Sequence, residues 1–213
     1  MYIGLLRITR EGLPYALALL GLAIILAWIH PLWSILPLIC FGYVLYFFRD
    51  PVRNAPADPL AIISAADGKI VGIDELAEPY YLNKTVRRVS IFLSIFDVHI
   101  NRSPVAGKVD YIEYHEGKFH NALEGKSSIL NEHNLIGMEN HHSKVCVKQI
   151  AGMIARRIVC YCSKGDEIKA GEKIGLIKFG SRVEIFMPLE TEILVQIGQK
   201  VKGGETIIGR LPN

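Results

Sequence analysis

The sequence contains few of the motifs that mark common metalloproteins or hydrolases. It has only four cysteines in 213 residues and no C-x-x-C pair, and it has neither an H-E-x-x-H motif nor a G-x-S-x-G motif. The cysteines are therefore interpreted as reduced, structural thiols, and no metal site is expected. The formal net charge of +3 is too small to indicate nucleic-acid binding, but it is compatible with an anionic lipid surface.

Charged residues are absent from a long segment near the N-terminus. No Asp, Glu, Lys or Arg occurs from Gly12 to Phe48, a length too great for one bilayer span of about 20 helical residues and short for two. The pair His30-Pro31 lies near its middle, where proline disfavours a continuous helix. We therefore expect a helical membrane hairpin inside an N-terminal anchor. Its helices would cover residues 13–29 and 32–48, and the anchor residues 1–53.

Basic residues lie on both sides of this apolar segment, with Arg7 and Arg10 before it and Arg49 and Arg53 after it. Because basic flanks favour the cytoplasmic side of a membrane, both ends of the hairpin are expected in the cytoplasm. A cleaved signal peptide fits poorly, since no small-residue cleavage site follows the first apolar run. A buried hairpin of a soluble protein is the other alternative. Residues 54–59, with two prolines, form a linker.

From residue 60 onward the pattern changes to short β-like runs separated by Gly, Asn and Asp. It predicts a mainly-β domain over residues 60–213, a sandwich or distorted barrel with few helices. Residues 165–174 and 198–207 both read G-x-x-[IV]-K-x-G-E-x-I, which predicts two strand–turn–strand hairpins like those of biotinyl and lipoyl carrier domains. The clearest runs are residues 69–73, 86–93, 108–113, 144–150 and 157–162.

Three places hold residues suited to chemistry. Asp97 and His99 stand two positions apart after an apolar run, so they would share one face of an extended segment. His141 and His142 are adjacent and would point to opposite faces of a strand. Ser181 follows a glycine between two strand-like runs. Taken singly, the first two places also fit a polar turn and a solvated loop, and a Gly-Ser pair by itself indicates no function.

Several longer stretches occur in a characteristic order along the chain. They are Tyr46-Phe-Phe-Arg-Asp-Pro51, Ala65-Ala-Asp-Gly-Lys69, Phe92-Leu-Ser-Ile-Phe-Asp-Val-His-Ile-Asn-Arg102 with Pro104, Gly117-Lys-Phe-His-Asn-Ala122, Asn131-Glu132, Gln149-Ile-Ala-Gly-Met-Ile-Ala-Arg-Arg157 and Phe179-Gly-Ser-Arg182. Together they resemble the phosphatidylserine decarboxylase family, in its short bacterial and archaeal form, over nearly the whole chain. Two positions depart from the family pattern: His120 replaces an aliphatic residue, and His133 replaces the arginine that usually follows Asn-Glu. They concern the shape of the lipid site rather than the reaction.

The resemblance implies an inactive precursor that cuts itself between Gly180 and Ser181, giving chains of residues 1–180 and 181–213. Ser181 would become a covalent pyruvoyl group, which acts as the electron sink when carbon dioxide leaves. The substrate would be phosphatidylserine and the product phosphatidylethanolamine, made on the cytoplasmic face of the cell membrane. The two chains would stay partners, no nucleic acid is expected, and a homodimer is left open.

The resemblance also implies roles for individual residues. Ser181 would be the nucleophile, which needs a base because a serine hydroxyl is weakly nucleophilic. Asp97 would orient an imidazole, as in a serine-protease triad. That imidazole would be His142, seven residues before Gln149. His99 would have a supporting role.

Two other functions compete with this one. A membrane-anchored adaptor or carrier-like protein would explain the C-terminal repeats, but it would not explain Asp97, His142 and the Gly180-Ser181 pair. A serine peptidase acting on other proteins predicts a mature chain that stays intact.

Overall fold

The computed structural model describes residues 2–3, 6–118, 130–152, 157–178 and 181–212. The chain divides into two compact units, Met1–Val52 and Arg53–Asn213. The first unit is built around two helices, and the second consists of β-sheets. Each unit is described by itself.

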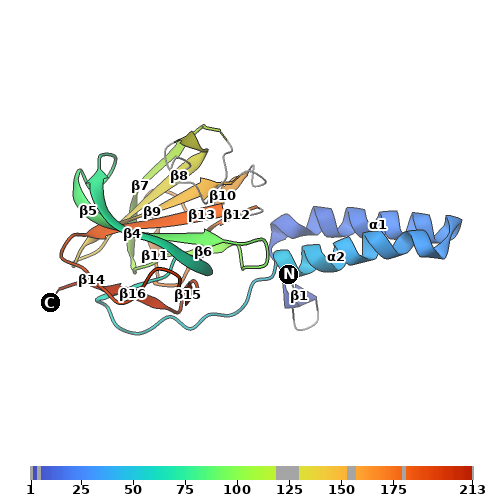
Figure 1. Ribbon diagram of the computed structural model, residues 1–213, viewed down its shortest axis with the longest axis horizontal. Helices are drawn as coiled ribbons and strands as arrows, with labels where there is room; N and C mark the ends of the chain where they lie inside the picture. The colour runs from blue at the N-terminus through green and yellow to red at the C-terminus, as the bar shows by residue number, and fades with distance from the viewer. Residues whose placement is uncertain (1, 4–5, 119–129, 153–156, 179–180, 213) are drawn as a thin grey trace. The chain divides into compact units, whose positions relative to one another are not determined.

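The first unit is a helical hairpin (Figure 1). Its elements are β1 (Tyr2–Ile3), β2 (Leu6–Arg7), the 3-10 turn η1 (Arg10–Gly12), α1 (Leu13–Ile29), the 3-10 turn η2 (Pro31–Ser34) and α2 (Ile35–Phe47). The expected pair of apolar helices is confirmed, with the break at His30 and Pro31. His30 is extended, and its Nδ1 accepts a hydrogen bond of 3.3 Å from the Leu32 N–H. Together η1 and α1 form one helix, Arg10–Ile29, that is long and apolar enough to cross a membrane, whereas Pro31–Phe47 is shorter.

Backbone contacts close the two ends of this hairpin on each other. The Thr9 N–H donates to the Phe48 carbonyl at 3.0 Å, and the Asp50 N–H donates to the Arg7 carbonyl at 2.7 Å. The rings of Tyr15 and Phe48 stack with centroids 5.8 Å apart. The basic residues that flank the apolar segment within this unit therefore lie at the same end of the hairpin.

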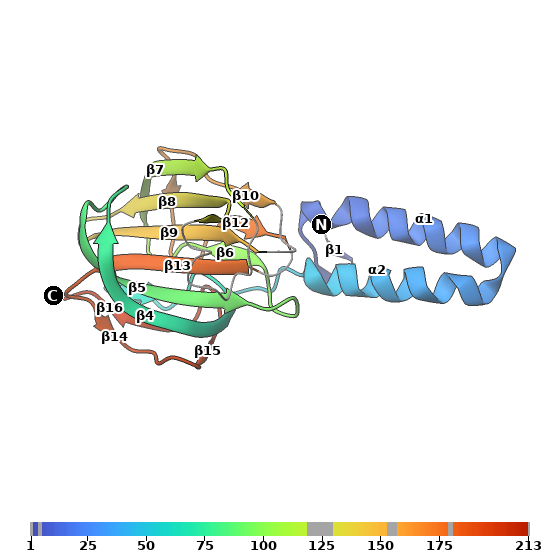
Figure 2. The same cartoon turned by 45° about the horizontal axis from the view of Figure 1, so that its top comes forward.

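The described part of the second unit contains the remaining strands, which form three antiparallel sheets. The strands are β3 (Ala61–Ile63), β4 (Gly68–Glu78), β5 (Lys84–Leu93), β6 (Ile100–Arg102), β7 (Gly107–His115), β8 (His133–Glu139), β9 (Lys144–Ala151), β10 (Ile158–Cys160), β11 (Glu167–Ile168), β12 (Lys173–Ile177), β13 (Ser181–Pro188), β14 (Glu192–Ile193), β15 (Lys200–Val201) and β16 (Ile207–Arg210). The largest sheet has the order β11-β7-β8-β9-β13-β5-β4-β15, and the smaller ones β10-β12-β6 and β14-β16-β3. The expected mainly-β architecture is confirmed, and Figure 2 shows the large sheet curling on itself.

The large sheet has two different faces, which β13 illustrates. Val183, Ile185 and Met187 belong to the main hydrophobic core. Because side chains alternate along a strand, Glu184 and Phe186 lie on the opposite face. There Phe186 packs in a small second cluster with Val86, Leu135 and Cys146. The main core therefore lies on one side of the sheet, and a smaller partly polar region lies on the other.

The two C-terminal repeats adopt the same local structure. Gly171 and Gly204 occupy equivalent positions and have φ of +78° and +80°, which glycine adopts without steric cost. Their N–H groups donate to the carbonyls of Ser103 at 2.9 Å and Ser64 at 2.8 Å. Strand, turn and strand form in each repeat, but the strands of one repeat do not pair with each other. β11 pairs with β7 and β12 with β6 and β10, while β15 pairs with β4 and β16 with β3 and β14. The expected hairpins are instead connections between sheets.

Candidate active site

Ser181 is the first residue of β13, a central strand of the large sheet. It lies opposite Leu93 of β5 on one side and opposite Ala151 of β9 on the other. By alternation it shares the core-facing side of β13 with Val183. Its side chain is fully buried, and its Oγ has no hydrogen-bond partner in the described part of the chain. Leaving a buried hydroxyl unsatisfied costs about 1–3 kcal/mol, so its presence calls for a functional explanation.

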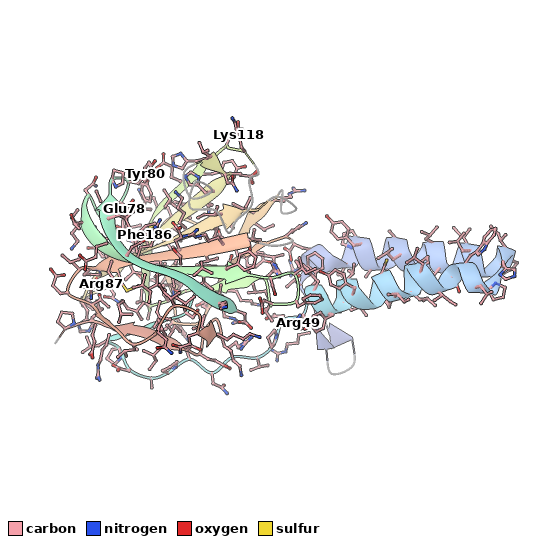
Figure 3. All side chains as sticks on the ribbon, in the orientation of Figure 1. Arg49, Glu78, Tyr80, Arg87, Lys118 and Phe186 are labelled. Atoms are coloured by element: carbon pink, nitrogen blue, oxygen red, sulfur yellow. The ribbon has the colours of Figure 1, made fainter. Side chains whose placement is uncertain are left out.

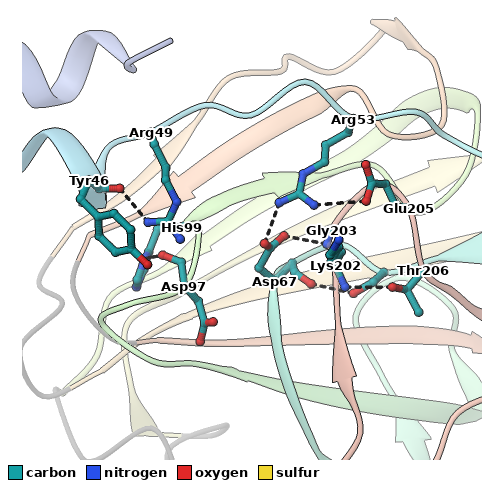
Figure 4. Close-up of polar contacts among 12 residues, drawn as sticks. Tyr46, Arg49, Arg53, Asp67, Asp97, His99, Lys202, Gly203, Glu205 and Thr206 are labelled. Atoms are coloured by element: carbon teal, nitrogen blue, oxygen red, sulfur yellow. Dashed lines mark hydrogen bonds and ion pairs between the residues drawn. The ribbon is translucent and has the colours of Figure 1, made fainter. Parts of the chain in front are cut away.

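Asp97 and His99 lie in the connection that follows β5. The Asp97 carboxylate accepts hydrogen bonds from the N–H and the Oγ of Ser94, at 2.8 and 2.7 Å, and so closes a tight turn. His99 is fully buried, and its Nδ1 lies 2.9 Å from the Asp97 carbonyl oxygen (Figure 4). Since a carbonyl can only accept, Nδ1 carries the proton and Nε2 is the basic ring nitrogen. The His99 imidazole is thus oriented by the Asp97 backbone, whereas the imidazole that Asp97 was expected to orient is that of His142.

Strand pairing brings this connection next to Ser181. Leu93, where β5 ends, pairs with Ser181, and the Ile177 N–H donates to the His99 carbonyl at 3.2 Å. Leu93 therefore lies beside Ser181, and His99 lies beside Ile177. Asp97 and His99 thus lie in the connection that leaves β5 at the end where Leu93 pairs with Ser181.

The structure places His142 elsewhere. It lies in the turn between β8 and β9, where its N–H donates to the Asn140 Oδ1 at 2.9 Å, and its side chain is exposed. The strand β9 starts at Lys144 and reaches Ser181 only at its last residue, Ala151. Seven steps of about 3.3 Å separate the ends of this strand by about 23 Å. The structure therefore does not assemble the predicted Asp97–His142–Ser181 relay, because the register of β9 carries the two histidines of this turn to the far end of the sheet.

Two of the predicted positions fall outside the described residues. They are Gly180, the residue before the expected cut, and His120. The other departure from the family pattern, His133, is described. It lies on the face of the sheet away from the main core, where its ring stacks on that of His115 with centroids 4.6 Å apart.

A second carboxylate, Asp67, lies close enough to Asp97 to feel its charge. It accepts hydrogen bonds from Arg53 Nη2 at 2.7 Å and from the Gly203 N–H at 2.8 Å, and Arg53 also pairs with Glu205 at 3.3 Å (Figure 4). Burial raises the pKa of Asp67, Arg53 opposes that rise, and the charge of Asp97 adds to it. This network joins the linker, the start of β4 and the C-terminal segment.

A buried chain of amides next to the site was missed by the sequence analysis. The Gln149 Nε2 donates to the Asn101 Oδ1 at 2.8 Å, and the Asn134 Nδ2 donates to the Gln149 Oε1 at 3.0 Å. A Cβ on Gly175 would lie only 2.5 Å from the Gln149 Nε2, so the close approach of β12 to β9 requires glycine there. Polar residues inside apolar strand runs are the only sequence signal for this network, and they do not show which residues pair.

Two cavities lie away from Ser181. One of about 490 Å³ lies on the face opposite the main core and is lined by Glu78, Tyr80, His133, Lys148, Glu184 and Phe186, among others. Figure 3 shows Glu78, Tyr80 and Phe186 near one another, close to the turn that connects β4 and β5. The other, of about 340 Å³, is lined by His141 and His142 together with linker residues. Neither cavity is lined by Ser181.

Known proteins match this chain over almost its full length. A family model described as phosphatidylserine decarboxylase matches residues 41–209. A protein of Carboxydothermus hydrogenoformans named phosphatidylserine decarboxylase proenzyme is 49% identical over 203 residues, covering 95% of each chain. Proteins with the same name from Syntrophus aciditrophicus and Desulfotalea psychrophila are 45% and 40% identical, with 95–96% of each chain covered.

The chain combines an apolar helical hairpin with a mainly-β unit that contains the buried Ser181. Together with these relatives, this combination defines an enzyme of the decarboxylase class. More narrowly, the chain belongs to the phosphatidylserine decarboxylase family. The enzymatic function is thereby supported over the non-catalytic adaptor. The long apolar helix of the first unit is consistent with membrane association.

Proposed function

We propose that the chain is a precursor that cuts itself at Ser181 and then decarboxylates phosphatidylserine to phosphatidylethanolamine. The observation that carries the proposal is the Ser181 hydroxyl, which is fully buried at the start of a central strand and has no hydrogen-bond partner in the described part of the chain. A hydroxyl whose hydrogen-bonding capacity is unused is available to attack the neighbouring backbone. The family, and the relatives named phosphatidylserine decarboxylase proenzyme, support the same interpretation.

The chain break uses atoms of the chain alone, and one water molecule enters in the final hydrolysis. Ser181 Oγ attacks the carbonyl carbon of Gly180, the amide C–N bond breaks, and an ester forms while the Ser181 nitrogen becomes an amine. Loss of the Ser181 Cα proton then expels the Gly180 carboxylate and leaves a dehydroalanine. Its tautomerisation and hydrolysis release ammonia and leave a ketone at the N-terminus of residues 181–213. The products are the chains 1–180 and 181–213.

His99 is the histidine that the geometry favours as the base for this step. Its ring is buried in the connection that pairs with the Ser181 segment, and the Asp97 carbonyl holds the tautomer in which Nε2 is basic. Asp97 is a positioning residue, because its carboxylate stabilises the turn that begins at Ser94 and its carbonyl orients the His99 ring. His142 lies at the other end of β9 and would act on Ser181 only after a large rearrangement.

The pyruvoyl group fits the place where Ser181 lies. It would be held covalently at the first residue of β13, between β5 and β9, and supplies the electron sink for the departing carbon dioxide. His99 would hold or deliver a proton beside it. Because the substrate is a bilayer lipid, the helical hairpin would keep the enzyme at the membrane. Arg7, Arg10 and Arg49 favour the cytoplasmic side of the membrane for the open end of the hairpin. A homodimer is compatible with this orientation.

The intact mass of the purified protein under denaturing conditions tests the proposal. We expect two chains split after Gly180, the smaller about 17 Da lighter than a chain with a plain N-terminal serine, because an amine is replaced by a ketone. The Ser181→Ala variant should stay a single inactive chain. Cleavage at the same bond in Ser181→Ala, or an intact wild-type chain with full decarboxylase activity, would refute the proposal.

A further inference from the structure

Cys160 and Cys162 form a pair of thiols at the edge of a small sheet. Cys160 ends β10, the outer strand of the sheet β10-β12-β6, and Cys162 follows two residues later. Both are free thiols, with Cys160 exposed and Cys162 half-buried. Their sulfur atoms lie 3.6 Å apart. A disulfide bond is about 2.05 Å long, so a shift of about 1.5 Å would join them.

The two thiols differ in acidity. The Cys162 thiol, by hydrogen bonding to the Cys160 sulfur, lowers the pKa of Cys160, and the Asn134 side chain acts in the same direction. The same interaction raises the pKa of Cys162. One member of the pair is therefore the readier thiolate, and its neighbour keeps its proton. A thiolate beside a second thiol is the arrangement that thiol–disulfide exchange uses.

The other two cysteines provide contrasts within the same chain. Cys146 is fully buried in the second hydrophobic cluster, where burial raises its pKa. Cys40 lies in α2 of the helical hairpin. Neither has a second cysteine within two residues in the sequence. Reactivity toward a disulfide in water should therefore be confined to the pair at the end of β10.

We propose that Cys160 and Cys162 are a reversible modification site that reacts with small disulfides of the glutathione class and closes to an intramolecular disulfide. In the first step the Cys160 thiolate attacks one sulfur of the small disulfide and expels one thiolate. In the second step Cys162 loses its proton to the solvent and attacks the Cys160 sulfur, which expels the second thiolate. The protein loses two electrons and the small disulfide gains them, becoming two thiols.

The closed form should be easy to reduce again. Two cysteines separated by one residue close a very small ring, and disulfides in strained geometry are more readily reduced. Under reducing conditions the pair is therefore open, as in the structure. It closes when the proportion of oxidised small disulfide rises.

The test uses the full-length protein in detergent, equilibrated with oxidised glutathione and then denatured in N-ethylmaleimide. We expect the cysteine-containing chain to take up two maleimides, against four for the reduced protein, and dithiothreitol to restore all four. Peptide mapping should place the lost pair at Cys160 and Cys162. Four reactive thiols after equilibration with excess oxidised glutathione, or loss at Cys40 or Cys146, would overturn the proposal.

Two variants separate the steps, and a third is the control. Cys162→Ser removes the resolving thiol, so it should accumulate one glutathione on Cys160. Cys160→Ser removes the attacking thiolate, so it should bind glutathione at least about tenfold more slowly, since exchange requires the thiolate. Cys40→Ser should close the disulfide as the wild type does. Equal rates for Cys160→Ser and Cys162→Ser would contradict the assigned order.

Discussion

At the scale of single residues, the structure reverses the expected order of two histidines, because the sequence analysis gave His142 the role of base and His99 a supporting role. His99 follows the run 86–93 and His142 precedes the run 144–150, and only the register of the strands shows which one lies near Ser181. His99 is fully buried with its tautomer defined by a carbonyl, while His142 is exposed in a turn. An exposed imidazole about 23 Å along a strand from the hydroxyl would take its proton only after a rearrangement of the chain.

Paired substitutions decide between the two histidines. His99→Ala should slow the conversion of the 213-residue chain into its two products by at least about 100-fold, because general-base catalysis contributes factors of this order. His142→Ala should be processed at the wild-type rate. The measurement is the fraction of cleaved chain against time after synthesis, by denaturing electrophoresis. Normal cleavage in His99→Ala together with a block in His142→Ala would mean that the precursor rearranges before it reacts.

A second residue-scale prediction concerns His133. Burial lowers the pKa of His133 to about 4, from an ordinary value near 6.5, although its Nδ1 lies 2.7 Å from the Asn131 carbonyl oxygen. Between these values the unfolded chain binds a proton that the folded chain does not, so stability falls as the pH falls from about 6.5 to 4. The loss should approach about 3 kcal/mol at the acid end.

Thermal unfolding of the detergent-solubilised protein across this pH range measures the effect. His133→Gln should weaken the dependence on pH, because the group that takes up the proton is gone. His141→Gln is the matched control, since it removes an exposed histidine from the turn that follows β8. An unchanged pH dependence in His133→Gln would show that the ring is not the group responsible.

At the scale of elements, β13 should hold the two proposed product chains together. It is the first segment of the chain 181–213, and it pairs along its length with β5 and over six residues with β9, both from the chain 1–180. Its core-facing side chains are fully buried in the main hydrophobic cluster. The small chain should therefore copurify with the large one in size-exclusion chromatography and separate only in denaturant.

Ile185→Ala tests the contribution of this strand. Ile185 is fully buried between Val89 and Val147, and truncation of such a side chain costs about 2–5 kcal/mol. The small chain should then dissociate at a lower urea concentration. Ile197→Ala, at a side chain that is 64% exposed, should leave the midpoint unchanged. Equal midpoints for the two variants would mean that β13 does not hold the chains together.

The same elements show what the sequence could predict. Alternation of apolar and polar residues located most strands within a few residues, and the charge-free segment located both helices, because these signals are local. Pairing is not local. The repeats at residues 165–174 and 198–207 revealed strands but not that β11 and β12 enter different sheets. The amide chain of Asn101, Gln149 and Asn134 and the place of His142 were hidden for the same reason.

At the scale of the whole molecule, the first unit should decide whether the protein reaches its lipid substrate. The helix α1 has 17 residues and is about 26 Å long, slightly less than a bilayer core of about 30 Å. Trp28 and Trp33 are both exposed at the tip of the hairpin, where aromatic side chains suit a membrane interface. Arg7, Arg10 and Arg49 lie toward its open end. This distribution fits a hairpin that enters from one side.

Leu22→Arg tests the role of the hairpin in membrane binding. Leu22 is 45% exposed near the middle of α1, and an arginine there costs about 2.5–3.5 kcal/mol on insertion scales. Flotation with phosphatidylcholine–phosphatidylserine vesicles gives the partition constant of the protein between membrane and water. This constant should fall by about 100-fold, since 1.4 kcal/mol is a factor of ten. Ile197→Arg makes the same change at an exposed side chain of the second unit and should float as the wild type does. The opposite result, with normal vesicle binding by Leu22→Arg and weakened binding by Ile197→Arg, would mean that the second unit rather than the hairpin binds the membrane.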